Sequence, residues 1–141
     1  MQRRKAREAA LQALFQIDVG KALADDAIGY AIMFNDLSED SEEFCRCLVT
    51  GVIANQAGID EIIGRLAVDW SLDRLGNVDR NVLRTALFEL MYLHDIPVGA
   101  TINEAVEIAK TFGNSDSGRF INGILGEFTR GYNPGQSRSE R

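Results

Sequence analysis

The chain has 141 residues and a formal net charge of −6 at pH 7, from 15 lysines and arginines against 21 aspartates and glutamates. This length suits one domain, or two small subdomains, that buries about two-thirds of the unfolded chain's surface. The sequence has two cysteines, no apolar run of about 18 residues and no signal-peptide pattern. We therefore expect a soluble, cytoplasmic protein with reduced thiols and no membrane partner, which argues against a disulfide scaffold, a transmembrane protein and an exported protein.

Positive charge is concentrated at the N-terminus, where four of the first seven residues are cations: Arg3, Arg4, Lys5 and Arg7. The other 134 residues hold 11 basic against 21 acidic groups, a net charge of −10, so the positive field is local. At a helix N-terminus each cation costs about 0.3 to 1 kcal/mol, because it opposes the helix dipole. We therefore predict a polyanionic partner, of which nucleic acid is the commonest. The alternative is a solvated, frayed terminus.

The spacing of apolar residues predicts an all-α fold of about seven helices. The first helix is expected over residues 3–19 and the second over residues 25–34. An acidic stretch at residues 38–43, typical of a helix N-terminus, introduces a third helix. An apolar stripe from Ile59 to Trp70 indicates a separate fourth helix.

The second half of the chain contains three more helical patterns. The fifth helix follows Gly76 and is expected to end at Ile96-Pro97, because the residue before a proline disfavours helical geometry. Residues 101–104 have the spacing of a capping box and predict the start of the sixth helix, which Gly113 ends. The cap residues at 114–117 introduce the seventh.

These helices are expected to form a single domain over residues 1–132, made of two packed subdomains over about 1–56 and 57–132. The polar tail at residues 133–141 is expected to be disordered, because it has little apolar surface to bury. No internal repeat divides the chain further.

No catalytic, metal-binding or cofactor-binding pattern is apparent. The single histidine, His94, is expected at a helix C-terminus, where it can bond a free carbonyl group. Cys45 and Cys47 lie two positions apart on a predicted helix and so face different directions, which prevents a shared metal. The sequence has no phosphate-binding glycine loop. We therefore expect a protein that is not an enzyme and needs no cofactor.

Two aromatic residues lie off the centre of their helices' apolar stripes. Phe15 falls beside Arg4 on the first helix, and Phe120 lies about 90° from the centre of the last helix's stripe. Single-stranded RNA is bound by aromatic rings that stack on unpaired bases and by cations along the backbone. We therefore predict that these two rings and the N-terminal cations together bind RNA. The alternative is that both rings fill seams between helices.

Three segments of the chain resemble the NusB family of transcription antitermination factors. They are the pattern ARE-A-LQ-LFQ-D at residues 6–18, NVDRNVLRTALFEL at residues 77–90, and DIPVGATINEAVEIAKTFGNSDSGRFINGIL at residues 95–125. The resemblance implies seven helices in two subdomains. It also implies a factor that joins the ribosomal protein NusE, binds boxA-type single-stranded RNA and supports the transcription elongation complex on ribosomal RNA operons.

The resemblance further implies roles for individual residues. The implied RNA contacts combine cations, aromatic rings and one carboxylate, and are Arg3, Arg4, Lys5, Arg7, Phe15, Arg84, Asp116 and Phe120. Some relatives have Tyr where this chain has Phe15, so stacking is kept and a hydroxyl hydrogen bond is not. Asp79 is implied to contribute to the surface that faces NusE. Two structural alternatives stay open: Asp116 as only an N-cap, and Arg84 as only an ion-pair partner.

Two other functions fit the same sequence. A NusB-like domain also begins some ribosomal RNA cytosine methyltransferases, where a much larger catalytic domain follows. The chain's end in a charged tail after the helical domain argues against this alternative. The second alternative is a purely structural helical module with a frayed basic end. The sequence leaves open whether the protein is a monomer or a homodimer.

Overall fold

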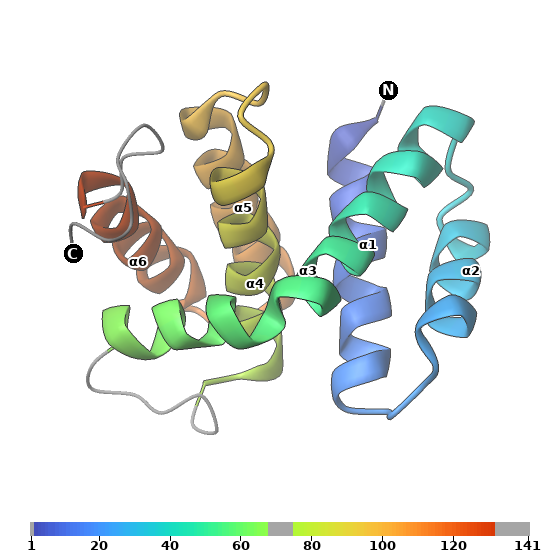
Figure 1. The fold of residues 1–141 in the computed structure, drawn as a ribbon, viewed down its shortest axis with the longest axis horizontal. Helices are drawn as coiled ribbons and strands as arrows, with labels where there is room; N and C mark the ends of the chain where they lie inside the picture. Colours follow the sequence, from blue (N-terminus) through green and yellow to red (C-terminus); the bar gives the residue numbers. More distant parts are fainter. Residues whose placement is uncertain (1, 68–74, 132–141) are drawn as a thin grey trace.

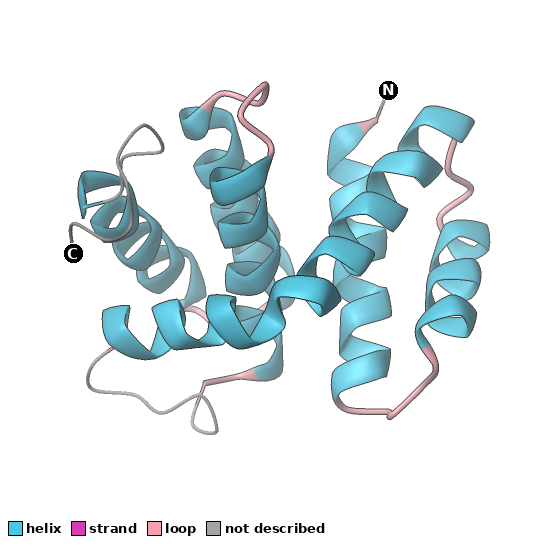
Figure 2. Ribbon diagram, in the orientation of Figure 1, coloured by secondary structure: helices cyan, strands magenta, loops and turns pink. Residues whose placement is uncertain are grey.

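The structure is a computed structural model that describes residues 2–67 and 75–131. These residues form six helices and no strand (Figures 1 and 2): α1 (Arg3–Asp18), α2 (Ala24–Phe34), α3 (Glu39–Leu66), α4 (Asn77–Tyr92), α5 (Val98–Phe112) and α6 (Ser117–Gly131). The prediction of an all-α fold is confirmed. Within the same two ranges, no helix has the length and apolar character needed to cross a membrane.

The helix count differs from the expected seven because α3 is one continuous helix of 28 residues. The expected third and fourth helices are its two halves, and their apolar stripes join into a single buried face from Cys45 to Ile63. Between them, the Asn55 side chain donates to the Gly51 carbonyl oxygen at 2.8 Å and so is accommodated inside the helix. The division into subdomains near residue 56 stays a prediction, and α3 runs through that point. Trp70 and the tail lie outside the described residues.

The capping box predicted at residues 101–104 was wrong, because α5 begins three residues earlier, at Val98. Pro97 precedes the first turn, where a missing backbone N–H group costs nothing. Thr101 lies inside the helix and is buried, and its hydroxyl donates to Glu89 Oε1 at 3.2 Å. A tertiary partner in α4 therefore uses the hydroxyl that the local pattern assigned to a cap.

The fifth predicted helix, α4, ends at Tyr92 rather than at Pro97. His94 follows this end, and its Nε2 atom lies 2.8 Å from the Met91 carbonyl oxygen. The expected contact between the histidine and a helix C-terminus is thus present, two residues beyond the helix.

The central helix of the molecule is α4, against which α1, α3, α5 and α6 all pack. Residues 81–90 of α4 are buried without interruption. In Figure 1, α1, α2 and the first half of α3 lie on one side of α4 and α6 lies on the other, while α5 overlaps α4 in this view. Because α1 and α5 both run antiparallel to α4, they are parallel to each other and begin at the same end of the molecule (Figure 1).

Where α3 crosses α4, Gly51 allows a close approach. A Cβ atom at this position would overlap the ring of Phe88, so only glycine lets the ring reach the α3 backbone. Gly58, seven residues further along α3, has nothing within 4 Å of the same point. The crossing of the two helices therefore depends on Gly51.

Cys45 and Cys47 are free thiols in α3, as the sequence predicts. Burial raises the pKa of Cys45 to about 11, so this thiol is protonated at neutral pH. Within the part of the chain that the structure describes, no three His, Cys, Asp or Glu side chains gather in a way that could hold a metal ion.

Candidate nucleic-acid interface

The four N-terminal cations occupy the first two turns of α1 and differ in exposure. Arg3 and Arg4 are exposed, Lys5 is partly buried and Arg7 is buried. The helix begins with no side-chain cap and no acidic residue in its first turn. The positive end of the helix dipole therefore adds to the field of the cations.

Arg7 is committed to a buried ion pair with Glu89 of α4. Its Nε atom donates to Glu89 Oε2 at 2.9 Å and its Nη2 atom donates to Oε1 at 2.7 Å. The Arg7 side chain is 5% exposed and that of Glu89 is 2% exposed. Because each charge would be costly to bury alone, this pair fixes α1 against α4.

Arg4 forms a second bidentate pair, with Glu104 of α5, at the surface. Its Nε atom donates to Glu104 Oε1 at 2.6 Å and its Nη2 atom donates to Oε2 at 2.7 Å. The two side chains are 49% and 25% exposed. Hydrogen bonds from Arg4 hold the pKa of Glu104 below its usual 4.5, although partial burial opposes this shift. The same hydrogen bonds raise the pKa of Arg4.

Arg3 and Lys5 form no ion pair within the residues that the structure describes. The guanidinium carbon of Arg3 lies 5.7 Å from the ring centroid of Phe44 in α3, and that of Arg7 lies 5.4 Å from it. These distances are typical of cation–π contacts. Phe44 therefore supports the Arg3 side chain while leaving its charge exposed.

A surface hollow of about 560 Å³ opens where α1 and α5 begin. Three of the N-terminal cations, Arg3, Arg4 and Arg7, line it, and Glu104 is the acidic residue in its wall. We refer to it as the basic hollow. It lies at the end of the molecule where the N-terminus is marked in Figure 1.

Phe15 does not lie at the basic hollow. It follows Arg4 by 11 residues on the same stripe of α1 and so lies about 16 Å further along the helix axis, at about 1.5 Å per residue. The connection between α5 and α6 lies at the same end of the molecule as the last turn of α1 (Figure 1). The structure thus divides the predicted RNA contacts between the two ends of α1.

Asp116 and Phe120 lie on either side of the start of α6. Asp116 is exposed, and its carboxylate forms no hydrogen bond or ion pair within the described ranges. Its backbone N–H donates to Asn114 Oδ1 at 2.8 Å, and its carbonyl oxygen accepts from the backbone of Phe120 at 3.0 Å. Phe120 is partly buried against the core. The carboxylate therefore does not cap α6, and the Phe120 side chain is packed in part against the core.

Arg84 lies inside the molecule, in ion pairs to two other helices. Its Nε and Nη2 atoms donate to the two carboxylate oxygens of Asp60 in α3, at 2.8 and 2.9 Å. Its Nη1 atom lies 3.3 Å from Asp18 Oδ2, at the end of α1. This arrangement agrees with the ion-pair alternative, and its predicted contact with RNA stays a prediction.

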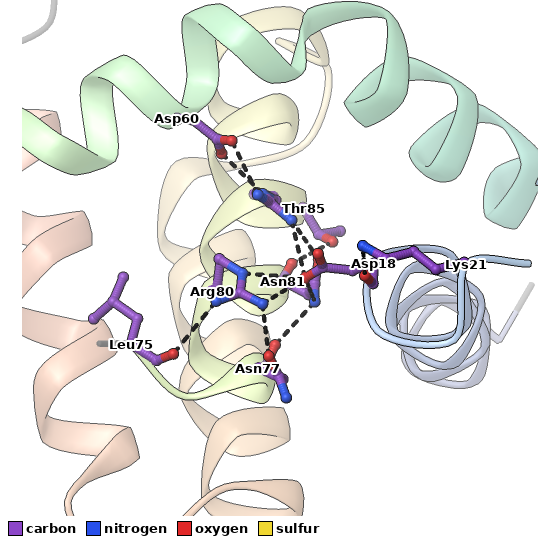
Figure 3. Close-up of polar contacts among 9 residues, drawn as sticks. Asp18, Lys21, Asp60, Leu75, Asn77, Arg80, Asn81 and Thr85 are labelled. Atoms are coloured by element: carbon purple, nitrogen blue, oxygen red, sulfur yellow. Dashed lines mark hydrogen bonds and ion pairs between the residues drawn. The ribbon is translucent and has the colours of Figure 1, made fainter. Parts of the chain in front are cut away.

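Sequence reasoning missed the polar network around Asp18, which Figure 3 shows between α1 and the first turns of α4. Asp18 Oδ2 accepts from Arg80 at 2.7 Å and from Asn81 at 3.2 Å, and Arg80 also donates to Asn77 Oδ1 at 2.6 Å. The motif NVDRN at the start of a buried helix was the available signal, because polar residues there need partners.

The charge of Asp18 is stabilised by this network. Partial burial alone raises the pKa of Asp18, but hydrogen bonds from Arg80 and Asn81 and the nearby charges of Arg80 and Arg84 outweigh it. The pKa of Asp18 therefore lies below its usual 3.8, and the carboxylate is ionised at neutral pH.

Asp79 differs from Asp18 because one of its carboxylate oxygens is buried and has no hydrogen-bond partner among the described residues. It lies in the first turn of α4, is 9% exposed, and its Oδ1 atom has no hydrogen-bond partner within the described residues. A buried polar atom without a partner costs free energy, and a group supplied by another molecule would remove that cost.

Comparison with known proteins identifies the family. The NusB family model matches residues 4–130. A relative from Pelotomaculum thermopropionicum, named transcription antitermination protein NusB, is 50% identical over 129 residues, which cover 89% of this chain and 88% of the relative. A relative of the same name from Bacillus subtilis is 47% identical over 125 residues, 89% of this chain and 92% of its own length.

Solved structures agree with this match. NusB of T. maritima superposes with a TM-score of 0.86 and 38% sequence identity, over 92% of each chain. A chain from a crystal structure of the antitermination factors NusB and NusE in complex with dsRNA superposes with a TM-score of 0.85 and 27% identity, over 94% of this chain and 100% of that chain. The family model, the curated relatives and the shared fold lead to one conclusion: the chain belongs to the NusB family.

Proposed function

We propose that this protein is a transcription antitermination factor that binds RNA together with the ribosomal protein NusE. It acts without catalysis, in the cytoplasm, as part of the transcription elongation complex. Family membership over residues 4–130 supports this function, and in a related structure NusB is bound with NusE and dsRNA. The methyltransferase alternative is disfavoured, because the two relatives described above are matched over 88% and 92% of their own length.

The basic hollow is the observation that carries the proposal. Its exposed cations, Arg3 and Arg4, stand at the positive end of α1 in a chain of net charge −6. The helix dipole does not favour this arrangement, because cations destabilise a helix N-terminus. A phosphate backbone placed there would satisfy both the cations and the helix end.

The aromatic residues supply the second part of the interface. We place Phe15, in the last turn of α1, and Phe120, in the first turn of α6, against unpaired bases, while the basic hollow holds the RNA backbone. Arg84 acts through the helices that it joins, and Asp116 borders the RNA path. A boxA-type single strand is the RNA that the family resemblance implies.

Asp79 is the proposed contact to NusE. A donor from NusE would pair with its unsatisfied Oδ1 atom. The position at the start of α4 keeps this contact away from the basic hollow, which lies at the other end of α4 (Figure 1). The NusE contact then does not obstruct the basic hollow.

A binding titration tests the function. A boxA-type single-stranded RNA and the duplex of the same sequence are each titrated with the protein, in the presence and absence of NusE. We expect binding of RNA that NusE tightens. The double variant Arg3→Gln/Lys5→Gln should weaken it, and the control Arg65→Gln/Lys110→Gln, which neutralises two exposed cations elsewhere, should not. No binding of either RNA with NusE present would overturn the proposal.

A further inference from the structure

Glu104 occupies the hydrogen-bonding edge of Arg4 that a phosphate would use. Both carboxylate oxygens accept from the guanidinium, at 2.6 and 2.7 Å. Carboxylate and phosphate bind this planar edge in the same bidentate way. Glu104 and an RNA phosphate therefore cannot take the same two donors at once.

Glu104 also removes charge from the basic hollow. Of the three cations that line the hollow, Arg7 is neutralised by Glu89 and Arg4 by Glu104, which leaves Arg3 without a carboxylate partner among the described residues. Glu104 is the acidic member of the wall, and it also lies 4.0 Å from Arg7 Nη1. An incoming phosphate therefore meets a negative charge inside a positive site.

The two ion pairs differ in whether another anion can displace them. The pair between Arg7 and Glu89 is buried and fully bonded, so opening it would leave two charges without partners. The pair between Arg4 and Glu104 is exposed at 49% and 25%, where solvent screens the attraction and ion pairs are weak. Of the two, the exposed pair is the one that phosphate can exchange.

We propose that Glu104 is an internal competitor for the RNA backbone, and that RNA binds by displacing it from Arg4. This inference rests on the proposed RNA-binding function. This competition increases specificity. Every RNA sequence shares the binding free energy from phosphate contacts, and Glu104 reduces that contribution, so contacts to bases determine a larger part of the affinity. Glu104 thus limits binding to RNA that lacks the preferred bases.

Glu104→Gln tests the proposal, because it keeps the shape of the side chain and removes its charge. With a single-stranded RNA oligonucleotide we expect about two- to five-fold tighter binding at low salt, the factor that corresponds to losing an exposed ion pair. The slope of log K against log salt should change by less than about 0.7, the contribution of one phosphate contact on a single strand, because Arg4 meets the phosphate in both proteins. Thermal melting verifies that the variant is folded.

The matched control is Glu107→Gln, one turn further along α5. Glu107 is exposed and pairs with Lys110 at 3.4 Å, so this variant also removes one charge and one surface ion pair from the same helix. We expect little change in RNA affinity or salt slope. An equal gain in both variants would mean a general charge effect and would overturn the proposal.

A double-mutant cycle isolates the contact to Arg4. If Glu104 competes at Arg4, then Glu104→Gln should give no gain in an Arg4→Gln background. A gain that persists there overturns the proposal, as does weaker binding of Glu104→Gln alone, which would mean that Glu104 positions Arg4 for RNA. If the wild-type protein with NusE binds no RNA, the proposed function fails and the competitor role fails with it.

Discussion

At the start of α1, side chains of the same chemistry have different tasks. Arg7 is buried and bonded to Glu89, Arg4 is half exposed and bonded to Glu104, and Arg3 lies on the ring of Phe44 with its charge exposed. The three side chains carry the same charge, so it is their burial that distinguishes their roles. A buried pair determines stability, whereas exposed cations determine the field that RNA meets.

This distinction predicts opposite results for two arginine variants. Arg7→Gln should lose about 3 to 5 kcal/mol of unfolding free energy, because it leaves the buried Glu89 carboxylate without its cation. Arg3→Gln should stay within about 0.5 kcal/mol of wild type and bind RNA more weakly. Urea denaturation and RNA titration measure the two effects. Wild-type stability in Arg7→Gln would contradict the importance of the buried pair.

The carboxylate of Asp116 gives a second prediction for a single residue. Because it does not cap α6, both Asp116→Asn and Asp116→Ala should keep wild-type thermal stability. Each removes a negative charge next to the proposed RNA path, so RNA binding should be unchanged or tighter. Weaker binding of Asp116→Asn at normal stability would show that the carboxylate itself contacts the RNA.

Among the elements, α3 and α4 define the shape of the molecule. Phe88 of α4 packs against the α3 backbone at Gly51, and Asp60 of α3 pairs with Arg84 of α4. The first contact is apolar and admits no additional atom, while the second is ionic and directional. Together they set both the distance between the two helices and their register.

Gly51→Ala tests the apolar contact. The new Cβ atom would overlap the Phe88 ring, so we expect a loss of about 1 to 3 kcal/mol of unfolding free energy. Gly58→Ala in the same helix is the control, because it has open space around it and should gain about 0.5 to 1 kcal/mol from helix propensity. Denaturant unfolding compares them. Equal effects of the two substitutions would mean that the close approach at Gly51 does not constrain the packing.

At the scale of the whole molecule, the Asp18 network joins the end of α1 to α4 and, through Arg84, to α3. Its parts come from three helices, and its bonds from Arg84 reach residues 24 and 66 positions away in the sequence. The network can therefore form only when these three helices are packed together.

The network predicts a pH dependence of stability. The pKa of Asp18 is lower in the folded protein than its usual 3.8, so its contribution is complete above that value and is lost as the pH falls through the lower folded pKa. Asp18→Asn should cost about 1.5 to 3 kcal/mol at neutral pH, and the difference from wild type should shrink below about pH 3.8.

The control for this pH series is Asp36→Asn. Asp36 is exposed and has a φ of 50°, which asparagine tolerates. Its unfolding free energy should follow that of wild type at every pH. A difference between Asp18→Asn and wild type that does not vary with pH would exclude the ionised carboxylate as the source of the stability.

The sequence was sufficient for features that depend on local patterns. Apolar spacing located most of the helices, whereas the polyanion site expected at the cations near residue 1 stays a prediction. The sequence was not sufficient for features that depend on residues far apart in the chain. Arg7 and Glu89 are 82 residues apart, and no local pattern indicates that they form a buried pair. Tertiary contacts also overrode two local signals, the apparent break between the halves of α3 and the capping box at Thr101.

The continuity of α3 has a consequence for how the gene can change. Each residue of an α-helix advances the chain by about 100° around the axis. One residue inserted between Gly51 and Asp60 would turn Asp60 away from Arg84 while Gly51 stays at Phe88, so both crossing contacts could not form together. Insertions and deletions in this stretch of α3 are therefore selected against, except in steps of about seven residues, which restore the angle but lengthen the helix.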